Sequence, residues 1–164
     1  MNLSGHFIDL ALRVLPGVVR ISARMSNAVY QERIEDYALA LLEAPDGGTA
    51  VIETGYLFPS DAGRPREVYY SLFGRTGCQV WWGEHAARAS HGQPWTEAEV
   101  NLDSDPLYPR FVTETLTAVR RGAPPPVGLD VMEAVMEVID GAYRSAQTGQ
   151  PVAVTIGTQG DGHA

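Results

Sequence analysis

The turns between apolar runs restrict the fold of this 164-residue chain more than any other feature. Residues 37–43 and 49–58 are apolar and partly β-branched, and Pro45-Asp46-Gly47-Gly48 between them is a strong hairpin signal. Residues 67–73 and 78–82 flank a second turn of this kind. Because hairpins join neighbouring antiparallel strands, the pattern predicts a sheet that is mostly antiparallel.

Segments with helical periodicity flank these runs, at residues 4–15, 108–121 and 129–147. Ser4 is expected to cap the first helix, and Gly122 and Gly149 to end the other two. Further strands are expected at 18–27, 86–90, 98–102 and 152–156. This order predicts an α+β fold, with an open, mostly antiparallel β-sheet and helices packed on one face. We expect one domain over 1–156 and a flexible tail over 157–164.

Charge and composition exclude several function classes. The net charge is −8, and all 12 basic residues are scattered arginines, so no basic footprint for nucleic acid is expected. No apolar run approaches the roughly 20 residues that span a bilayer, so no membrane association is expected. With no basic segment before the first apolar stretch and with Cys78 as the only cysteine, a cytoplasmic location is expected.

His6 and Asp9 are the first candidate site residues. They are three positions apart, so they share one face of the predicted first helix and could act as an acid–base or orienting pair. Asp9 has an alternative role as a first-turn acid that complements the helix dipole. His85 and His91 have no helical ligand spacing and no cysteine cluster beside them, so no metal site is predicted.

Three stretches, in order along the chain, resemble the C-terminal domain of the Gfo/Idh/MocA oxidoreductases, the family of glucose–fructose oxidoreductase and inositol dehydrogenase. They are Ser4-Gly5-His6-Phe7-Ile8-Asp9-Leu10, Glu35-Asp36-Tyr37-Ala38 leading into residues 46–53, and residues 142–152, which read AYRSAQTGQPV. The resemblance implies a large, mostly antiparallel open sheet that follows a Rossmann domain, supplies substrate contacts and builds the oligomer. It implies hydride transfer between NAD or NADP and a sugar or cyclitol.

The resemblance also implies roles for individual residues. His6 matches the histidine that faces the substrate hydroxyl, which makes it the candidate catalytic residue, while Asn2, Asp9 and Tyr143 are candidate substrate contacts. Tyr143 can equally be a core residue, because it lies on the apolar stripe of the last helix.

The sequence also departs from the family pattern. Asn2 stands where the family has an aspartate, and the chain has no lysine to replace the family's catalytic lysine. No Gly-rich strand–turn–helix fingerprint occurs, so we expect no cofactor to be bound by this chain alone. The resemblance therefore suggests part of an NAD(P)-dependent oxidoreductase that is not catalytically complete alone, with a separate Rossmann-domain subunit as one conceivable partner.

Two other readings remain open from the sequence. The chain could be a stand-alone polyol-binding or scaffold homodimer derived from that domain, or an unrelated enzyme that needs no lysine, such as a hydrolase. A homodimer through the sheet face is expected both for the oxidoreductase part and for the stand-alone protein. The reason is that residues 37–42 are almost entirely apolar, as in sheets covered on both faces.

Overall fold

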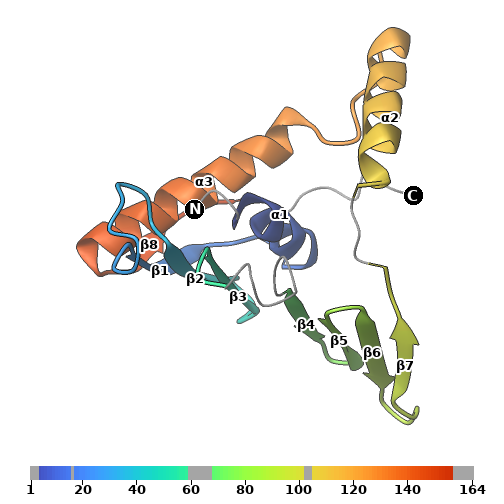
Figure 1. The fold of residues 1–164 in the computed structure, drawn as a ribbon, viewed down its shortest axis with the longest axis horizontal. Coiled ribbons are helices and arrows are strands. Elements are labelled where there is room, and N and C mark those ends of the chain that lie inside the picture. The colour runs from blue at the N-terminus through green and yellow to red at the C-terminus, as the bar shows by residue number, and fades with distance from the viewer. Residues whose placement is uncertain (1–3, 16, 59–67, 102–104, 157–164) are drawn as a thin grey trace. The chain divides into compact units, whose positions relative to one another are not determined.

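The computed structural model describes residues 4–15, 17–58, 68–101 and 105–156. The chain forms two compact units, of which unit 1 comprises residues 1–57 and 124–164 and unit 2 comprises residues 58–123. Each unit has its own four-stranded antiparallel sheet (Figure 1).

Unit 1 is built on a sheet with the strand order β3-β2-β1-β8. Its strands are β1 (Arg20–Ser26), β2 (Tyr37–Glu43), β3 (Thr49–Gly55) and the two-residue β8 (Val152–Ala153), and its helices are α1 (Ser4–Val14) and α3 (Leu129–Thr148). The register pairs Ala23 with Ala40 and Ala40 with Ile52, so β2 lies between two full-length neighbours.

Both helices of unit 1 cover the same face of this sheet. Burial alternates along β2, where Ala38, Ala40 and Leu42 are buried and the residues between them are half-exposed. Helix α3 lies along β1, and α1 contacts α3 and β3 (Figure 1). The core of the molecule lies between the helices and this face, with Ile8, Val18, Ile21, Leu42 and Val138 among its fully buried side chains.

Unit 2 contains a second sheet, with the strand order β4-β5-β6-β7. Its strands are β4 (Tyr69–Phe73), β5 (Gly77–Trp82), β6 (His85–Ser90) and β7 (Thr96–Glu99), followed by α2 (Leu107–Arg121). Trp81 and Trp82 point to opposite faces: the Trp81 ring meets Tyr70 edge-on, at a centroid distance of 6.3 Å, and the Trp82 ring lies 5.9 Å from His85. Because they lie on opposite faces, the two tryptophans cannot share one role.

The predicted α+β class with antiparallel strands is confirmed, but the strands divide into two sheets instead of one. Gly122 and Gly149 end α2 and α3 in the left-handed conformation that glycine adopts without strain, as predicted. Two details of the prediction were wrong. Ser4 lies inside α1 instead of before it, and the last strand covers two residues of the predicted 152–156.

The single domain predicted over 1–156 stays a prediction, and the predicted tail at 157–164 lies outside the described residues. No helix in the described ranges has the length and apolar character needed to cross a membrane.

Candidate functional site

Helix α1 places His6 at one end of the unit 1 sheet. Ile8 and Leu12 are buried against the sheet and fix the orientation of the helix, which leaves His6 exposed. The hydroxyl groups of Ser4 and Thr54 share a hydrogen bond of 2.6 Å, which ties the start of the helix to the end of β3. The histidine therefore lies near the end of β3 and the beginning of β2.

The connection between β1 and β2 lies at the same end of the sheet and is held by Asp36. This side chain is 3% exposed, and its Oδ2 accepts hydrogen bonds from the backbone N–H groups of Val29 and Tyr30, both at 2.9 Å. The Asp36 carbonyl accepts the N–H of Tyr56 at 2.9 Å. Oδ1 has no hydrogen-bond partner within the described ranges. Asp36 thus joins the β1–β2 connection to the end of β3, through its buried carboxylate on one side and its carbonyl on the other. We call this arrangement the Asp36 clamp.

Two tyrosines are presented to solvent by this arrangement. Tyr30 is 56% exposed and Tyr56 is 48% exposed, and the Tyr30 hydroxyl donates to the Tyr56 carbonyl at 3.1 Å. Exposed aromatic faces suit the C–H surfaces of sugars and cyclitols. Tyr30, Tyr56 and the Asp36 clamp were not predicted as site residues, since no periodicity in the sequence marks residues that an irregular connection brings together.

Tyr143 reaches the same region from α3. Its ring packs against the core, and its hydroxyl donates to Glu35 Oε1 at 2.8 Å. Burial raises the pKa of Tyr143, because the charged phenolate loses hydration there. The structure therefore brings His6 and Tyr143 to one end of unit 1, and it gives Tyr143 a structural contact with Glu35, beside the Asp36 clamp.

The other predicted contacts are placed differently. Asp9 lies in the second turn of α1, so its expected position in the first turn was wrong. The Arg13 guanidinium donates hydrogen bonds to Asp9 Oδ2 at 3.1 and 3.2 Å. This ion pair joins residues one helical turn apart and stabilises the helix. Asn2 lies outside the described residues. In the described part of the chain, no group of three or more His, Cys, Asp or Glu side chains could hold a metal ion.

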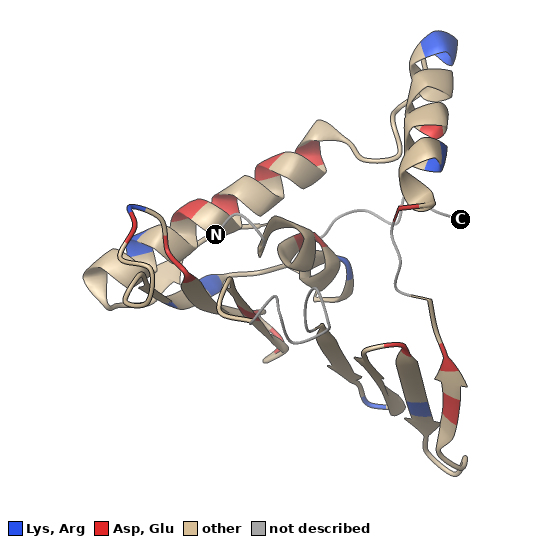
Figure 2. Cartoon of the chain, viewed as in Figure 1, with Lys and Arg blue, Asp and Glu red and all other residues tan. Residues whose placement is uncertain are grey.

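The N-termini of α2 and α3 do not fit the pyrophosphate of a nicotinamide cofactor. Helix α2 begins after Pro106, which has no N–H to donate, and α3 carries Asp130 in its first turn. Figure 2 shows acidic residues along the first half of α3. Because a helix N-terminus binds phosphate through free N–H groups and a positive dipole end, a proline or a carboxylate at that place opposes binding. At this end of unit 1 the described residues offer hydrogen bonding, aromatic contact and the exposed imidazole of His6.

Comparisons with known proteins agree with this fold. Residues 1–79 match the family model for the GFO/IDH/MocA C-terminal domain. A search of curated proteins finds no significant match. Among solved structures, an oxidoreductase from Agrobacterium radiobacter in complex with NAD+, L-tartaric acid and magnesium has a TM-score of 0.75 and 20% identity, over 92% of this chain and 47% of its own.

Two further structures are similar. The WlbA dehydrogenase from Bordetella pertussis, in complex with NADH and UDP-GlcNAcA, has a TM-score of 0.72 at 19% identity, over 94% of this chain and 47% of its own. A levoglucosan dehydrogenase in complex with NADH and levoglucosan has a TM-score of 0.77 at 12% identity, over 93% of this chain and 49% of its own.

The predicted resemblance to the C-terminal domain of the Gfo/Idh/MocA oxidoreductases is thereby confirmed. This chain spans a little less than half the length of these solved structures.

Proposed function

We propose that this chain is the substrate-binding and oligomerisation part of an NAD(P)-dependent oxidoreductase that acts on a sugar or cyclitol. His6 faces the substrate hydroxyl, and the nicotinamide cofactor is bound by residues outside this chain. The alternative is a stand-alone polyol-binding or scaffold homodimer, and both readings use the sheet face described below. The cytoplasmic location stays a prediction.

The observation that supports the proposal is that exposed His6 lies at the same end of the unit 1 sheet as the exposed rings of Tyr30 and Tyr56. The Ser4–Thr54 hydrogen bond and the Asp36 clamp hold His6, Tyr30 and Tyr56 at one end of one sheet. No described residue makes a hydrogen bond or an ion pair with the His6 side chain, so its ring nitrogens are available to a ligand. The family match over residues 1–79 includes all three residues. The similar structures hold NAD+ or NADH, and two of them hold a sugar or sugar nucleotide.

Binding experiments on the full chain test this proposal. Calorimetric titration should show no binding of NADH at micromolar concentration, because the N-termini of α2 and α3 do not suit a pyrophosphate and the sequence has no Gly-rich strand–turn–helix fingerprint. Micromolar NADH binding would count against the proposal. Two-dimensional NMR with myo-inositol and D-glucose should shift the signals of His6, Tyr30 and Tyr56, and the shifts should be lost in His6→Ala and retained in His91→Ala, a control in unit 2.

Activity separates the two readings, because polyol binding that depends on His6 is expected in both. Hydride transfer to NAD+ only after a nucleotide-binding subunit is added favours the oxidoreductase. The DNA immediately upstream gives an independent test, because an in-frame Rossmann-coding stretch or a neighbouring Rossmann gene is expected only for the oxidoreductase.

The proposed homodimer uses the face of the unit 1 sheet opposite α1 and α3. Its centre is apolar, because Leu39 and Leu41 project from β2 and Val51, 66% exposed, projects from β3. Charges of opposite sign flank this centre: the register places Arg24 on β1 and Glu53 on β3 in one row with Leu39. Isolated apolar side chains are common on surfaces, but a contiguous set on a sheet face marks an interface.

The layout of charge makes this face complementary to itself. A two-fold axis parallel to β2, between two facing sheets, places β1 of one copy over β3 of the other. Arg24 of each copy then lies opposite Glu53 of the other, on both sides of the apolar centre. The Tyr37 hydroxyl donates to Glu53 Oε1 at 2.9 Å and orients that carboxylate. The hydrogen bond to Glu53 also raises the pKa of Tyr37.

Charge reversal tests the dimer. Light scattering should give a dimeric mass for the native chain and a lower mass for Arg24→Glu and for Glu53→Arg, because each places like charges face to face. The double variant should recover the dimer, and Arg144→Glu, in α3, should leave the mass unchanged. A monomeric native chain at micromolar concentration, or a double variant no better than the single ones, would refute the two-fold arrangement.

A further inference from the structure

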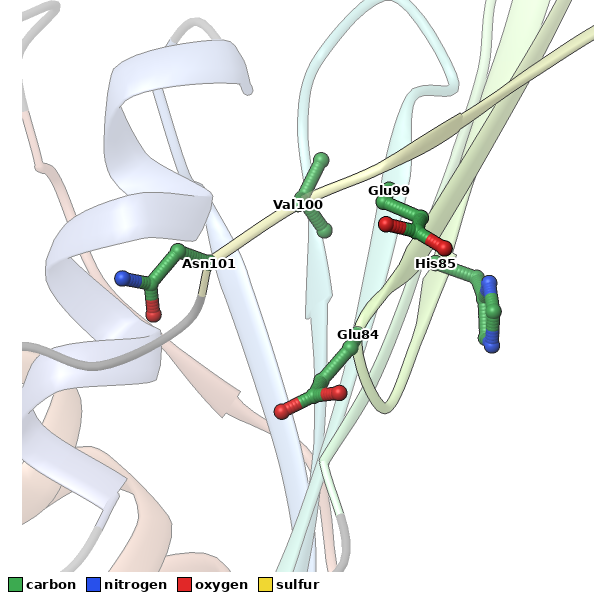
Figure 3. Close-up of a pocket in the computed structure, with 5 residues that line it drawn as sticks. All are labelled: Glu84, His85, Glu99, Val100 and Asn101. Carbon is green, nitrogen blue, oxygen red and sulfur yellow. The ribbon is translucent and has the colours of Figure 1, made fainter.

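A pocket in unit 2 lies between the β5–β6 turn and the end of β7. It is lined by Glu84, His85, Glu99, Val100 and Asn101 (Figure 3). Glu84 and His85 project in opposite directions, so these two side chains cannot meet one ligand. The groups around this pocket therefore do not converge on a ligand. The β1–β2 connection of unit 1, in contrast, brings interacting side chains together from three elements.

The β1–β2 connection, residues 27–36, keeps its shape through its own hydrogen bonds. The Gln31 N–H donates to the Asn27 carbonyl at 2.8 Å. Gln31 has a φ of 56°, in the left-handed region that residues other than glycine seldom adopt and that persists where the surrounding contacts impose it. The Asp36 carboxylate accepts the N–H of the preceding residue, Tyr30. The connection is therefore one preformed piece, and any movement of it carries Tyr30 along.

Two consecutive acids, Glu35 and Asp36, attach this connection to two different elements. On one side, the Asp36 carbonyl accepts the N–H of Tyr56, just after β3, at 2.9 Å. On the other side, Glu35 Oε1 accepts the hydroxyl of Tyr143 at 2.8 Å, from α3 and 108 residues away in the sequence. The position of the connection against the helix layer therefore depends on the Tyr143–Glu35 hydrogen bond.

Tyr143 is a fixed point for this attachment. Its ring packs against the core. Two residues further along α3, Ser145 is fully buried and accepts the backbone N–H of Ala23 at 3.0 Å, which ties this turn of the helix to β1. The Tyr30 ring, in contrast, is 56% exposed. A ligand at this end of the sheet can therefore meet the Tyr30 ring, whereas the Tyr143 ring is packed and its hydroxyl is already engaged.

We propose that Tyr143 is a positioning residue, which acts through Glu35 to hold the Tyr30 ring beside Tyr56 and does not itself contact the ligand. The identity of that ligand as a polyol rests on the proposed function. A direct contact between the Tyr143 hydroxyl and a polyol would require the hydroxyl to leave its carboxylate acceptor, and hydrogen bonds to carboxylates are among the stronger ones in proteins. The two roles differ in one measurable way: only a positioning residue affects the connection when no ligand is present.

NMR of the ligand-free chain tests the proposal first. In Tyr143→Phe the attachment to α3 is lost, so the amide signals of Tyr30 and Gln31 should shift and their hydrogen exchange should become faster. Tyr37→Phe is the matched control, because the Tyr37 hydroxyl also donates to a glutamate carboxylate, at 2.9 Å, but on the sheet face opposite the helices. The control should leave both amides unchanged. Native signals and native exchange at Tyr30 and Gln31 in Tyr143→Phe would overturn the proposal.

Variants of Glu35 test whether the effect passes through this side chain. Glu35→Ala should reproduce the changes at Tyr30, whereas Glu35→Gln keeps an oxygen that can accept the Tyr143 hydroxyl and should remain close to the native chain. The double variant Tyr143→Phe/Glu35→Ala should be no more altered than either single variant, because the two side chains form one bond. Additive changes at Tyr30 would contradict a shared bond.

Calorimetric titration with myo-inositol connects the pair to the ligand. Tyr143→Phe should weaken binding about tenfold, and it should cause no further loss in a Tyr30→Ala background, because its effect passes through the Tyr30 ring. An equal loss in both backgrounds would indicate direct contact by Tyr143 and overturn the proposal. If neither myo-inositol nor D-glucose binds the native chain, that result counts against the proposed function alone, and the ligand-free NMR comparison still decides whether Tyr143 positions Tyr30.

Discussion

Replacing Ser145 with alanine tests how α3 is attached to the sheet. Ser145 is fully buried, and its Oγ accepts the backbone N–H of Ala23 at 3.0 Å. On this side of β1 the strand β8 pairs only with Arg20 and Ile21, so β8 does not reach the Ala23 amide. A hydroxyl on α3 therefore takes the place of a sheet partner. This contact also explains one residue of the AYRSA stretch, whose serine could not be assigned a role from the sequence.

The magnitude follows from the burial of this group. In Ser145→Ala the Ala23 N–H loses its acceptor in a place that water does not reach, which costs about 1–3 kcal/mol. Total folding stability is roughly 5–15 kcal/mol, so the change is a large fraction of it. Ser26→Ala is the matched control: the Ser26 hydroxyl also accepts a backbone N–H, from Ala28 at 3.1 Å, but in an exposed turn where water replaces it. The control should lose less than about 0.5 kcal/mol.

Urea unfolding followed by circular dichroism measures the loss, and amide hydrogen exchange locates it. The Ala23 amide should exchange faster in Ser145→Ala, by about tenfold for each 1.4 kcal/mol of lost protection. Amides of unit 2 should be unaffected. A variant within about 0.5 kcal/mol of the native chain, with unchanged exchange at Ala23, would refute the reasoning that Ser145 substitutes for a strand.

Two further predictions concern packing and charge. In Gly141→Ala the new Cβ would lie 2.8 Å from Ile21 Cδ1 and 3.3 Å from Val154 Cγ1. Chemical denaturation should therefore show a loss of about 1–3 kcal/mol in the free energy of unfolding, partly offset by the higher helix propensity of alanine. The control Gly5→Ala in α1 meets nothing within 4 Å and should be neutral or stabilising. The hydrogen bond from Arg20 lowers the pKa of Glu43, so NMR titration should find the pKa of the Glu43 carboxyl below the usual glutamate range. The contribution of this pair to stability is present above the unfolded-state pKa and is lost as the pH falls through the folded-state pKa. Arg20→Gln should abolish both the lowered pKa and this pH dependence.

Local signals in the sequence were sufficient for most elements. The strands at 37–43, the helix starting at 129 and the glycine ends of α2 and α3 lie where alternation, periodicity and turn residues placed them. These signals act within a few residues, so they are visible without a fold. The separation of Trp81 from Trp82 follows from the same short-range geometry.

The candidate site was predicted only in part, because its partners come from distant segments. The sequence pointed to His6 and Tyr143, but it could not show that Thr54 anchors the start of α1, that Glu35 accepts the Tyr143 hydroxyl, or that Asp36 holds Tyr30 beside Tyr56. Asp9 appeared suited to orient a histidine, and the structure pairs it with Arg13 instead, one helical turn away.

The sequence by itself therefore determined the α+β class, the order of the elements, the approximate limits of most of them, and the histidine at the start of α1. Only the tertiary structure decided that the strands divide into two sheets, which face of the β1–β3 sheet α1 and α3 cover, and that Glu84, His85 and Glu99 line one pocket. The physical reason is that periodicity shows which side of an element is apolar. Which other element packs on that side depends on contacts between residues far apart in the chain.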